Sequence, residues 1–148
     1  MKKMYIASDH RGIGLKDALL PFLNEQSFEV VDVTPTKNAD GSIDFPLASQ
    51  AVAQHVVQEG AQGLILCGSG IGVAIAANRF KGIRAATAHT PEEIHEAKEH
   101  NHINVLCLGA DETSKENAEA LISAWIEAKP DTAERRLRRL AQLDTYGS

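Results

Sequence analysis

The stretch Leu64-Ile65-Leu66-Cys67-Gly68-Ser69-Gly70-Ile71-Gly72 decides the fold of this chain. The apolar run that ends at Cys67 predicts a buried strand, and the glycine-rich turn after it leads into a helix. A strand that passes through a tight loop into a helix is the repeating unit of parallel sheets. We therefore expect an α/β protein, with the same unit on both sides of this stretch.

The rest of the chain alternates between short β-type runs and helical patterns. The strands are predicted at Tyr5 to Ser8, Glu29 to Val33, Gly63 to Cys67, Arg84 to Ala88 and Asn104 to Leu108. The helices are predicted at Leu15 to Glu25, Phe45 to Glu59, Gly72 to Phe80, Pro91 to His100, Ser114 to Ala128 and Thr132 to Leu143. This alternation predicts one doubly wound, Rossmann-like domain over residues 1–148, with a five-stranded parallel sheet, helices on both faces and a C-terminal helix.

Composition narrows the classes of function. A net charge of −5 argues against nucleic acid as a partner, because binding to the phosphate backbone needs a broad basic surface. No apolar run approaches the ~20 residues of a membrane span and no signal peptide is visible, so we expect a cytoplasmic protein without a membrane partner. Two cysteines, Cys67 and Cys107, are too few for a disulfide scaffold, and we interpret both as reduced thiols.

The fold places the expected site at the ends of the first and third strands. In doubly wound sheets a ligand binds beyond the carboxyl ends of the strands where the strand order reverses, and in a flavodoxin-like order that point lies between these two strands. The first strand ends in Ser8-Asp9-His10-Arg11-Gly12 and the third in Cys67-Gly68-Ser69-Gly70. Reactive side chains and a glycine-rich turn are thus expected to meet at one ligand site.

Cys67 is the candidate base. The turn formed by Gly68, Gly70, Ile71 and Gly72 offers backbone N–H groups to an anion, and the positive end of the following helix favours a thiolate by lowering the pKa of the thiol. A base beside an oxyanion hole suits proton abstraction next to a carbonyl, with Ser69 as a hydrogen-bonding or relay group. The alternative is a cysteine packed at a strand end beside permissive glycines, which is our preferred interpretation of Cys107.

A dinucleotide site is the main competitor for this turn. The G-x-G-x-x-G pattern laid on Gly68 and Gly70 places Val73 at the third glycine, and no Gly-Lys-Ser/Thr follows to make a Walker A motif. Cofactor binding therefore stays only a weak alternative, and we expect no cofactor.

Asp9 and His10 are candidate substrate contacts. The Asp9 carboxylate can accept hydrogen bonds from sugar hydroxyls, and His10 can donate to a phosphate or a hydroxyl. The alternative is that Asp9 caps the next helix and His10 points to solvent.

His100-Asn101-His102 is expected in a loop between a helix and the fifth strand, where His100 can act as an acid or base on a ring oxygen and Asn101 can hold a hydroxyl. Two histidines without a further ligand do not make a metal site, so no metal is predicted.

The last predicted helix holds the basic residues. Arg135 and Arg139 are one turn apart on one face and are the candidate phosphate clamp, whereas Arg136 and Arg138 are expected to point elsewhere. The alternative is a solvated basic face paired with neighbouring acids.

Taken together, nearly the whole chain resembles the family of ribose-5-phosphate isomerase B and galactose-6-phosphate isomerase. The motifs that carry the resemblance are Ser8-Asp9-His10 with Gly12, Asp44-Phe45-Pro46, the Cys67 to Gly72 turn running into Ala76-Ala77-Asn78-Arg79, Gly82-Ile83-Arg84-Ala85, and His100-Asn101 with Asn104-Val105-Leu106. The glycine turn is intact, as in the ribose type.

The resemblance implies an aldose–ketose isomerase that interconverts ribose 5-phosphate and ribulose 5-phosphate through an enediolate, without cofactor or metal. It implies that Cys67 moves the proton with Ser69 assisting, that His100 opens the sugar ring, and that Asp9 and Asn101 contact its oxygens. His10, Arg135 and Arg139 are then the phosphate ligands. A homodimer or dimer of dimers with sites shared between subunits is implied as well.

Three departures from the family pattern leave the substrate open. Asp111 stands where the family usually has a phosphate-binding arginine, Phe45 where many relatives have tyrosine, and Ala133-Glu134-Arg135-Arg136 where Gly-Gly-Arg-His is usual. A negative charge at position 111 would repel phosphate, so Asp111→Arg is expected to strengthen phosphate binding. The alternatives are an isomerase of allose, galactose or erythrulose phosphate, and a non-catalytic subunit that binds sugar phosphate.

Overall fold

The computed structural model describes residues 1–147 and contains every predicted strand and helix. The strands are β1 (Lys2–Ser8), β2 (Phe28–Asp32), β3 (Gln62–Cys67), β4 (Ala85–Thr87) and β5 (Val105–Gly109). The helices are α1 (Ile13–Asn24), α2 (Phe45–Glu59), α3 (Ile71–Ala77), α4 (Pro91–Asn101), α5 (Lys115–Glu127) and α6 (Glu134–Leu143). The boundaries differ most at β1, which begins at Lys2 rather than Tyr5, and at α3, which ends at Ala77 rather than Phe80.

Helix α3 ends early because the side chain of Asn78 turns to the chain beyond it. The Asn78 amide donates to the carbonyl of Ala85 at 2.8 Å and accepts from the Ala85 N–H at 2.8 Å. This pair fixes the start of β4 against the end of α3.

All strand pairs in the sheet are parallel, in the order β2-β1-β3-β5-β4. The reversal between β1 and β3 is confirmed, but the flavodoxin-like order is wrong at the far edge, where β4 and β5 are exchanged. The handedness of the connections accounts for the helix positions: the chain moves outward from β3 to β4 and back to β5, and a right-handed crossover then places α3 and α4 on opposite faces.

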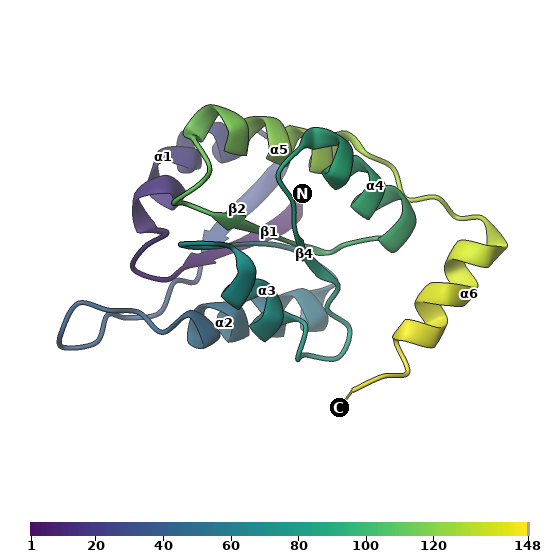
Figure 1. Cartoon of the computed structure of the whole chain (residues 1–148), viewed down its shortest axis with the longest axis horizontal. Helices are drawn as coiled ribbons and strands as arrows, with labels where there is room; N and C mark the ends of the chain where they lie inside the picture. Colours follow the sequence, from purple (N-terminus) through teal and green to yellow (C-terminus); the bar gives the residue numbers. More distant parts are fainter. Residues whose placement is uncertain (148) are drawn as a thin grey trace.

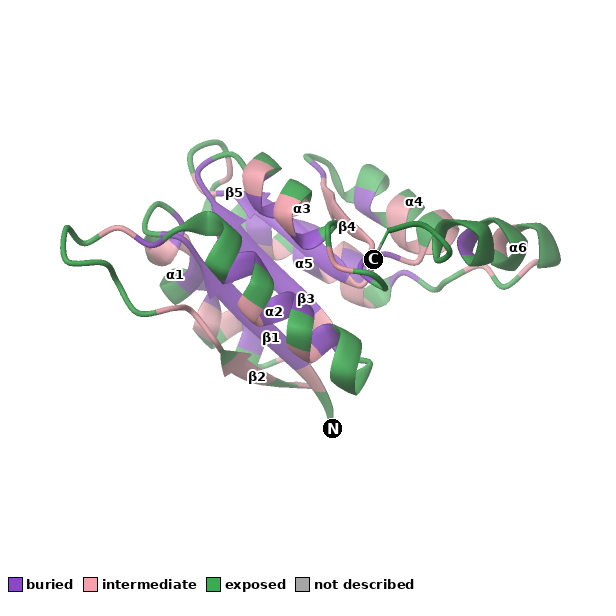
Figure 2. Cartoon of the chain, turned by 90° about the horizontal axis from the view of Figure 1, so that it is seen from below, coloured by how far each residue is buried: buried purple, intermediate pink, exposed green. Residues whose placement is uncertain are grey.

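The helices form a layer on each face of the sheet. Figure 1 shows α1, α4 and α5 above the sheet and α2 and α3 below it. Each layer encloses its own apolar cluster, one around Trp125, Leu106 and Ile6 and the other around Val52, Ile65 and Cys107. In Figure 2 the strands β1, β3 and β5 are buried along most of their length. The sheet is therefore a rigid support for the loops at its carboxyl edge.

Helix α6 stands apart from these layers. Figure 1 shows it to one side of the sheet, beyond the end of α4. Leu140 is buried, whereas Leu137 and Leu143 remain 48% and 46% exposed. An amphipathic helix with uncovered leucines has apolar surface that the described residues do not bury.

Candidate active site

Asp9 holds the loop that leaves β1. Its carboxylate is 6% exposed, and Oδ1 accepts from the backbone N–H groups of Arg11 at 2.9 Å and Gly12 at 3.0 Å. The Asp9 N–H in turn donates to the carbonyl of Leu66 at 3.1 Å, just before Cys67. Asp9 thus holds the loop between β1 and α1 but does not cap α1, whose N-cap is Gly12 without a side-chain hydrogen bond, so the alternative of a helix cap is wrong. Asp9 lies beside the end of β3, as the site prediction expected.

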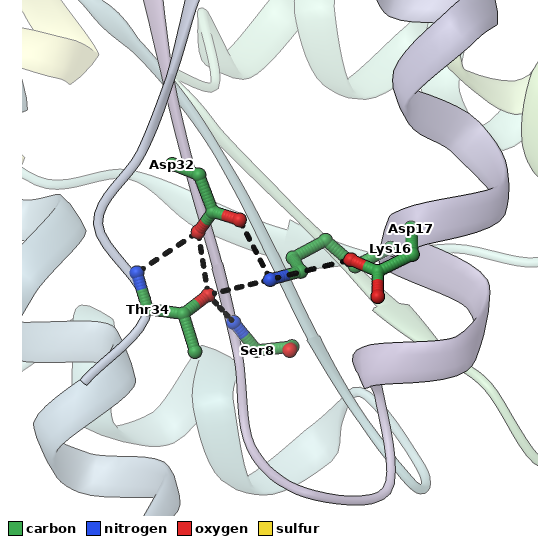
Figure 3. A network of polar contacts seen from close by, with 5 residues as sticks. All are labelled: Ser8, Lys16, Asp17, Asp32 and Thr34. Carbon is green, nitrogen blue, oxygen red and sulfur yellow. Dashed lines mark hydrogen bonds and ion pairs between the residues drawn. The ribbon is translucent and has the colours of Figure 1, made fainter. Parts of the chain in front are cut away.

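A network of polar side chains joins the end of β1 to α1 and to the end of β2, next to the same loop (Figure 3). The ammonium of the buried Lys16 donates to Asp32 at 2.7 Å and to the hydroxyl of Thr34 at 3.0 Å. Thr34 also accepts from the Ser8 N–H at 3.3 Å and donates to Asp32 at 2.6 Å. Burial alone would raise the pKa of Asp32, but the hydrogen bonds from Lys16 and Thr34 outweigh it and the pKa is lowered. The exit of β1 is therefore tied to α1 and to the exit of β2.

His10 lies at the surface of this loop with one ring nitrogen fixed. Its Nδ1 is 3.1 Å from the backbone nitrogen of Ile43 and 3.3 Å from the carbonyl of Ile43. When the Ile43 N–H donates to Nδ1, the ring proton is on Nε2. The ring can then present an N–H donor on the side opposite Ile43.

Cys67 ends β3 with its sulfur turned into the glycine loop. The thiol is 5% exposed, and Sγ accepts from the N–H of Gly70 at 3.1 Å. Gly70 has φ +78°, a left-handed conformation that glycine adopts without strain and that aims its N–H back at the sulfur. The Gly70 N–H is thus directed at the sulfur that the sequence predicts as the base.

The residues after Cys67 complete the loop. The exposed Ser69 accepts from the N–H of Ile71 at 3.2 Å, which leaves its own O–H able to donate to a ligand. Gly72 lies in the first turn of α3, against the ring of Phe45. The first N–H groups of a helix have no partner within it, so those of α3 are suited to an oxyanion.

Cys107 has none of these features. It lies on β5 with no exposed surface, and burial raises its pKa far above the ordinary value for a thiol. The sequence-based interpretation of Cys107 as a packing residue is confirmed by this burial.

The other predicted site residues gather at α4 and α6. His100 and Asn101 are the last residues of α4, so the predicted loop position is wrong. The helix ends at Asn101 because the next residue, His102, has the left-handed φ of +48°. A hollow of about 360 Å³ is lined by His100, Asn101, Arg136, Arg139, Leu140, Gln142, Leu143 and Tyr146.

Arg136 rather than Arg135 faces this hollow together with Arg139. The prediction that Arg136 points elsewhere is wrong because it is one turn before Leu140, the buried residue of α6. Arg136 also pairs with Asp131 at 3.3 Å, whereas Arg138 pairs with Glu134 at 3.0 Å on the exposed side.

The two groups of site residues lie at opposite edges of the sheet. Helix α4 runs antiparallel to the strands, so His100 is near the amino end of β5, whereas Cys67 is at the carboxyl end of β3. The strand between those edges spans roughly 16 Å at ~3.3 Å per residue. One copy of the chain therefore brings together Asp9, His10 and the Cys67 loop, and separately His100, Asn101 and Arg139.

Sequence reasoning missed one residue at the carboxyl edge. The Arg11 guanidinium pairs with the Asp111 carboxylate across the exit of β3. Part of the signal was present, since an arginine follows Asp9-His10 and an aspartate stands at position 111, where the family resemblance leads one to expect an arginine.

Two further properties concern the described residues 1–147. No group of three or more His, Cys, Asp or Glu side chains there is placed to hold a metal ion. None of the helices in that range is both long enough and apolar enough to cross a membrane.

Comparison with known proteins identifies one family. A family model described as Ribose/Galactose Isomerase matches residues 4–143. The chain is 35% identical over 130 residues to ribose-5-phosphate isomerase B of Escherichia coli, covering 87% of this chain and 86% of that protein. It is 35% identical over 135 residues to D-erythrulose-4-phosphate isomerase 2 of Mycolicibacterium smegmatis, covering 88% and 89%. Ribose-5-phosphate isomerase B from Mycoplasma genitalium, solved with bound ribulose-5-phosphate, superposes with a TM-score of 0.89 at 31% identity, covering 97% of this chain and 95% of that chain.

Proposed function

The chain belongs to the ribose/galactose isomerase family, and on that basis we propose that it interconverts ribose 5-phosphate and ribulose 5-phosphate with Cys67 as the base. The observation that carries the proposal is the Gly70 N–H donating to Cys67 Sγ at 3.1 Å within an intact glycine loop. The same turn holds the sulfur in place and supplies further N–H donors.

The reaction follows from this arrangement. His100 protonates the ring oxygen of the bound sugar while the anomeric hydroxyl gives its proton to water, which breaks the bond between C1 and the ring oxygen and leaves the open-chain aldehyde. The Cys67 thiolate then takes the proton from C2, and the electron pair moves into a C1–C2 double bond as the carbonyl becomes an enediolate oxygen. The N–H groups of the loop and the Ser69 hydroxyl stabilise that charge. Ser69 then relays the proton of the C2 hydroxyl to the C1 oxygen, and return of the proton from sulfur to C1 leaves the ketone at C2 and a hydroxyl at C1.

A homodimer supplies both halves of the site. His100 and Cys67 of one copy lie near opposite ends of the strands, so the His100 group of one subunit works with the Cys67 loop of the other. The surface beside Cys67 supports such a contact: Ile71 and Ile75, one turn apart on α3, are 57% and 61% exposed. These isoleucines and the uncovered leucines of α6 are the apolar surface that a partner would bury.

Complementation between inactive variants tests the shared site. Cys67→Ala and His100→Asn are each expected to be inactive as homodimers, while a mixed dimer contains one doubly altered site and one intact site. Random mixing should restore about a quarter of wild-type turnover. No recovery after verified subunit exchange would show that each subunit works alone. Wild-type turnover of ribose 5-phosphate, measured first, tests the function itself.

A second substrate is supported by one observation. The relative from Mycolicibacterium smegmatis is named as an isomerase of D-erythrulose 4-phosphate, a shorter sugar phosphate. A panel of ribose, allose, galactose and erythrulose phosphates, compared by kcat/KM, decides among them. Preference for ribose 5-phosphate supports the proposal, and preference for the four-carbon sugar replaces it.

We place the enzyme in the cytoplasm, because a reducing compartment keeps the catalytic thiol of Cys67 free.

We also propose that residues 1–148 form a single domain. Limited proteolysis of the native protein tests this, because an internal cut that releases two stable fragments would contradict it.

A further inference from the structure

Arg11, Gly68 and Asp111 contact one another at the carboxyl end of β3. Arg11, from the loop after β1, lies with its guanidinium against Gly68, directly beside Cys67. Asp111, from the loop after β5, pairs with that guanidinium and donates its backbone N–H to the carbonyl of Gly68 at 3.0 Å. The exits of three strands are thus joined by one ion pair at the catalytic loop.

Gly68 makes room for the guanidinium. A Cβ built at Gly68 would overlap Cζ, Nε and Nη1 of Arg11, so any side chain there would displace the cation. The backbone of Arg11 is fixed as well, because its N–H donates to Asp9 at 2.9 Å. Both ends of the side chain are therefore held in place beside the loop.

The guanidinium retains capacity for a ligand. Within residues 1–147 the Arg11 guanidinium donates one hydrogen bond, to Asp111. A guanidinium has five N–H donors in a planar fork, so the others are available to a ligand. The Arg11 side chain is 57% exposed and that of Asp111 is 42% exposed, so an anion in the site can reach the fork. Paired donors of this shape match two oxygens of a phosphate.

We propose that Arg11 binds the phosphate group of the sugar phosphate at the Cys67 site. The inference rests on the proposed function and assigns one of its binding residues. It also changes the meaning of Asp111: the carboxylate is not a lone negative charge facing the phosphate, because Arg11 neutralises it. The repulsion of phosphate expected from a negative charge at position 111 is thereby weakened rather than abolished.

The test compares Arg11→Ala and Arg11→Lys with wild type, with Lys115→Ala as the matched control. Lys115 is also an exposed cation in a single ion pair, with Glu119 at 3.8 Å, but lies on α5. Arg11→Ala should raise both KM for ribose 5-phosphate and the dissociation constant of inorganic phosphate by roughly 10- to 100-fold, with little change in kcat. Arg11→Lys keeps the charge and loses the fork, so its values should lie between.

Phosphate binding is measured by calorimetry, independently of turnover, on variants whose circular dichroism and thermal melting match wild type. If inorganic phosphate binds Arg11→Ala as tightly as wild type, the proposal is overturned even where KM rises. Should Arg11→Ala fail to fold, Arg11→Lys alone decides by the same comparison. A wild-type protein that binds phosphate but turns over no sugar phosphate would sink the proposed function and leave the assignment of Arg11 standing.

Discussion

Replacing Lys16 by methionine tests the polar network behind the site, because the side chain is nearly the same length and loses only its charge. Lys16 is 5% exposed and its ammonium lies 2.7 Å from Asp32. Removing one partner of a fully buried ion pair costs about 3 to 5 kcal/mol of unfolding free energy. The Asp32 side chain is 35% exposed, so water screens part of this cost and the expected loss is about 1 to 3 kcal/mol.

The pH dependence of that loss has a definite sign. The pKa of Asp32 is lowered in the folded protein from its ordinary value of 3.8, so the ion pair contributes stability above that pH and loses it as the pH falls through the lower, folded-state pKa. The difference between wild type and Lys16→Met should therefore be largest at neutral pH and shrink below about pH 4.

Urea unfolding followed by the fluorescence of Trp125, the one tryptophan of the chain, measures both effects at a fixed protein concentration. Lys115→Met removes an exposed ion pair and should change stability by no more than about 0.5 kcal/mol. A loss for Lys16→Met equal to that of this control, or one that stays constant from neutral to acid pH, would refute the reasoning.

Three further outcomes are expected. Asp111→Asn removes a negative charge while its amide oxygen can still accept from Arg11, so phosphate should bind a few-fold more tightly at low salt, an effect that disappears at high salt; weaker binding would contradict it. Gly70→Ala forces a side chain into φ +78° and against Thr87, so thermal melting should show destabilisation of about 1 to 3 kcal/mol, and an unchanged midpoint would argue against the loop geometry. A thiol reagent should modify Cys67 in the native protein and Cys107 only after unfolding, because burial raises the pKa of Cys107; rapid native labelling of both would disprove this.

Sequence reasoning recovered the elements because their signals are local. The alternation of strand and helix patterns, the glycine turn after Cys67 and the proline in the first turn of α2 depend on neighbouring residues alone. The order of β4 and β5 does not. β4 has three residues, and its position at the sheet edge is decided by which strand it pairs with after the crossover.

The part of the site at the carboxyl ends of the strands was predictable from the sequence, and the part at α4 and α6 was less so. Asp9, His10 and Cys67 follow adjacent strands, so parallel topology alone brings them together. Which arginines of α6 line the hollow depends on how Leu140 packs toward α4. The helical period alone shows which residues share a face, but not which face is turned toward α4. The contact of Arg11 with Asp111 joins residues 100 positions apart, and only the fold places them together.

Removal of the C2 proton by Cys67 is the central step of the proposed reaction. That step is measured directly by following, in heavy water, the exchange of the C2 hydrogen of ribose 5-phosphate by nuclear magnetic resonance. We expect exchange with wild type and a rate roughly 10²- to 10⁴-fold lower with Cys67→Ser, at unchanged fold. Exchange at the wild-type rate in that variant would contradict the role assigned to the sulfur.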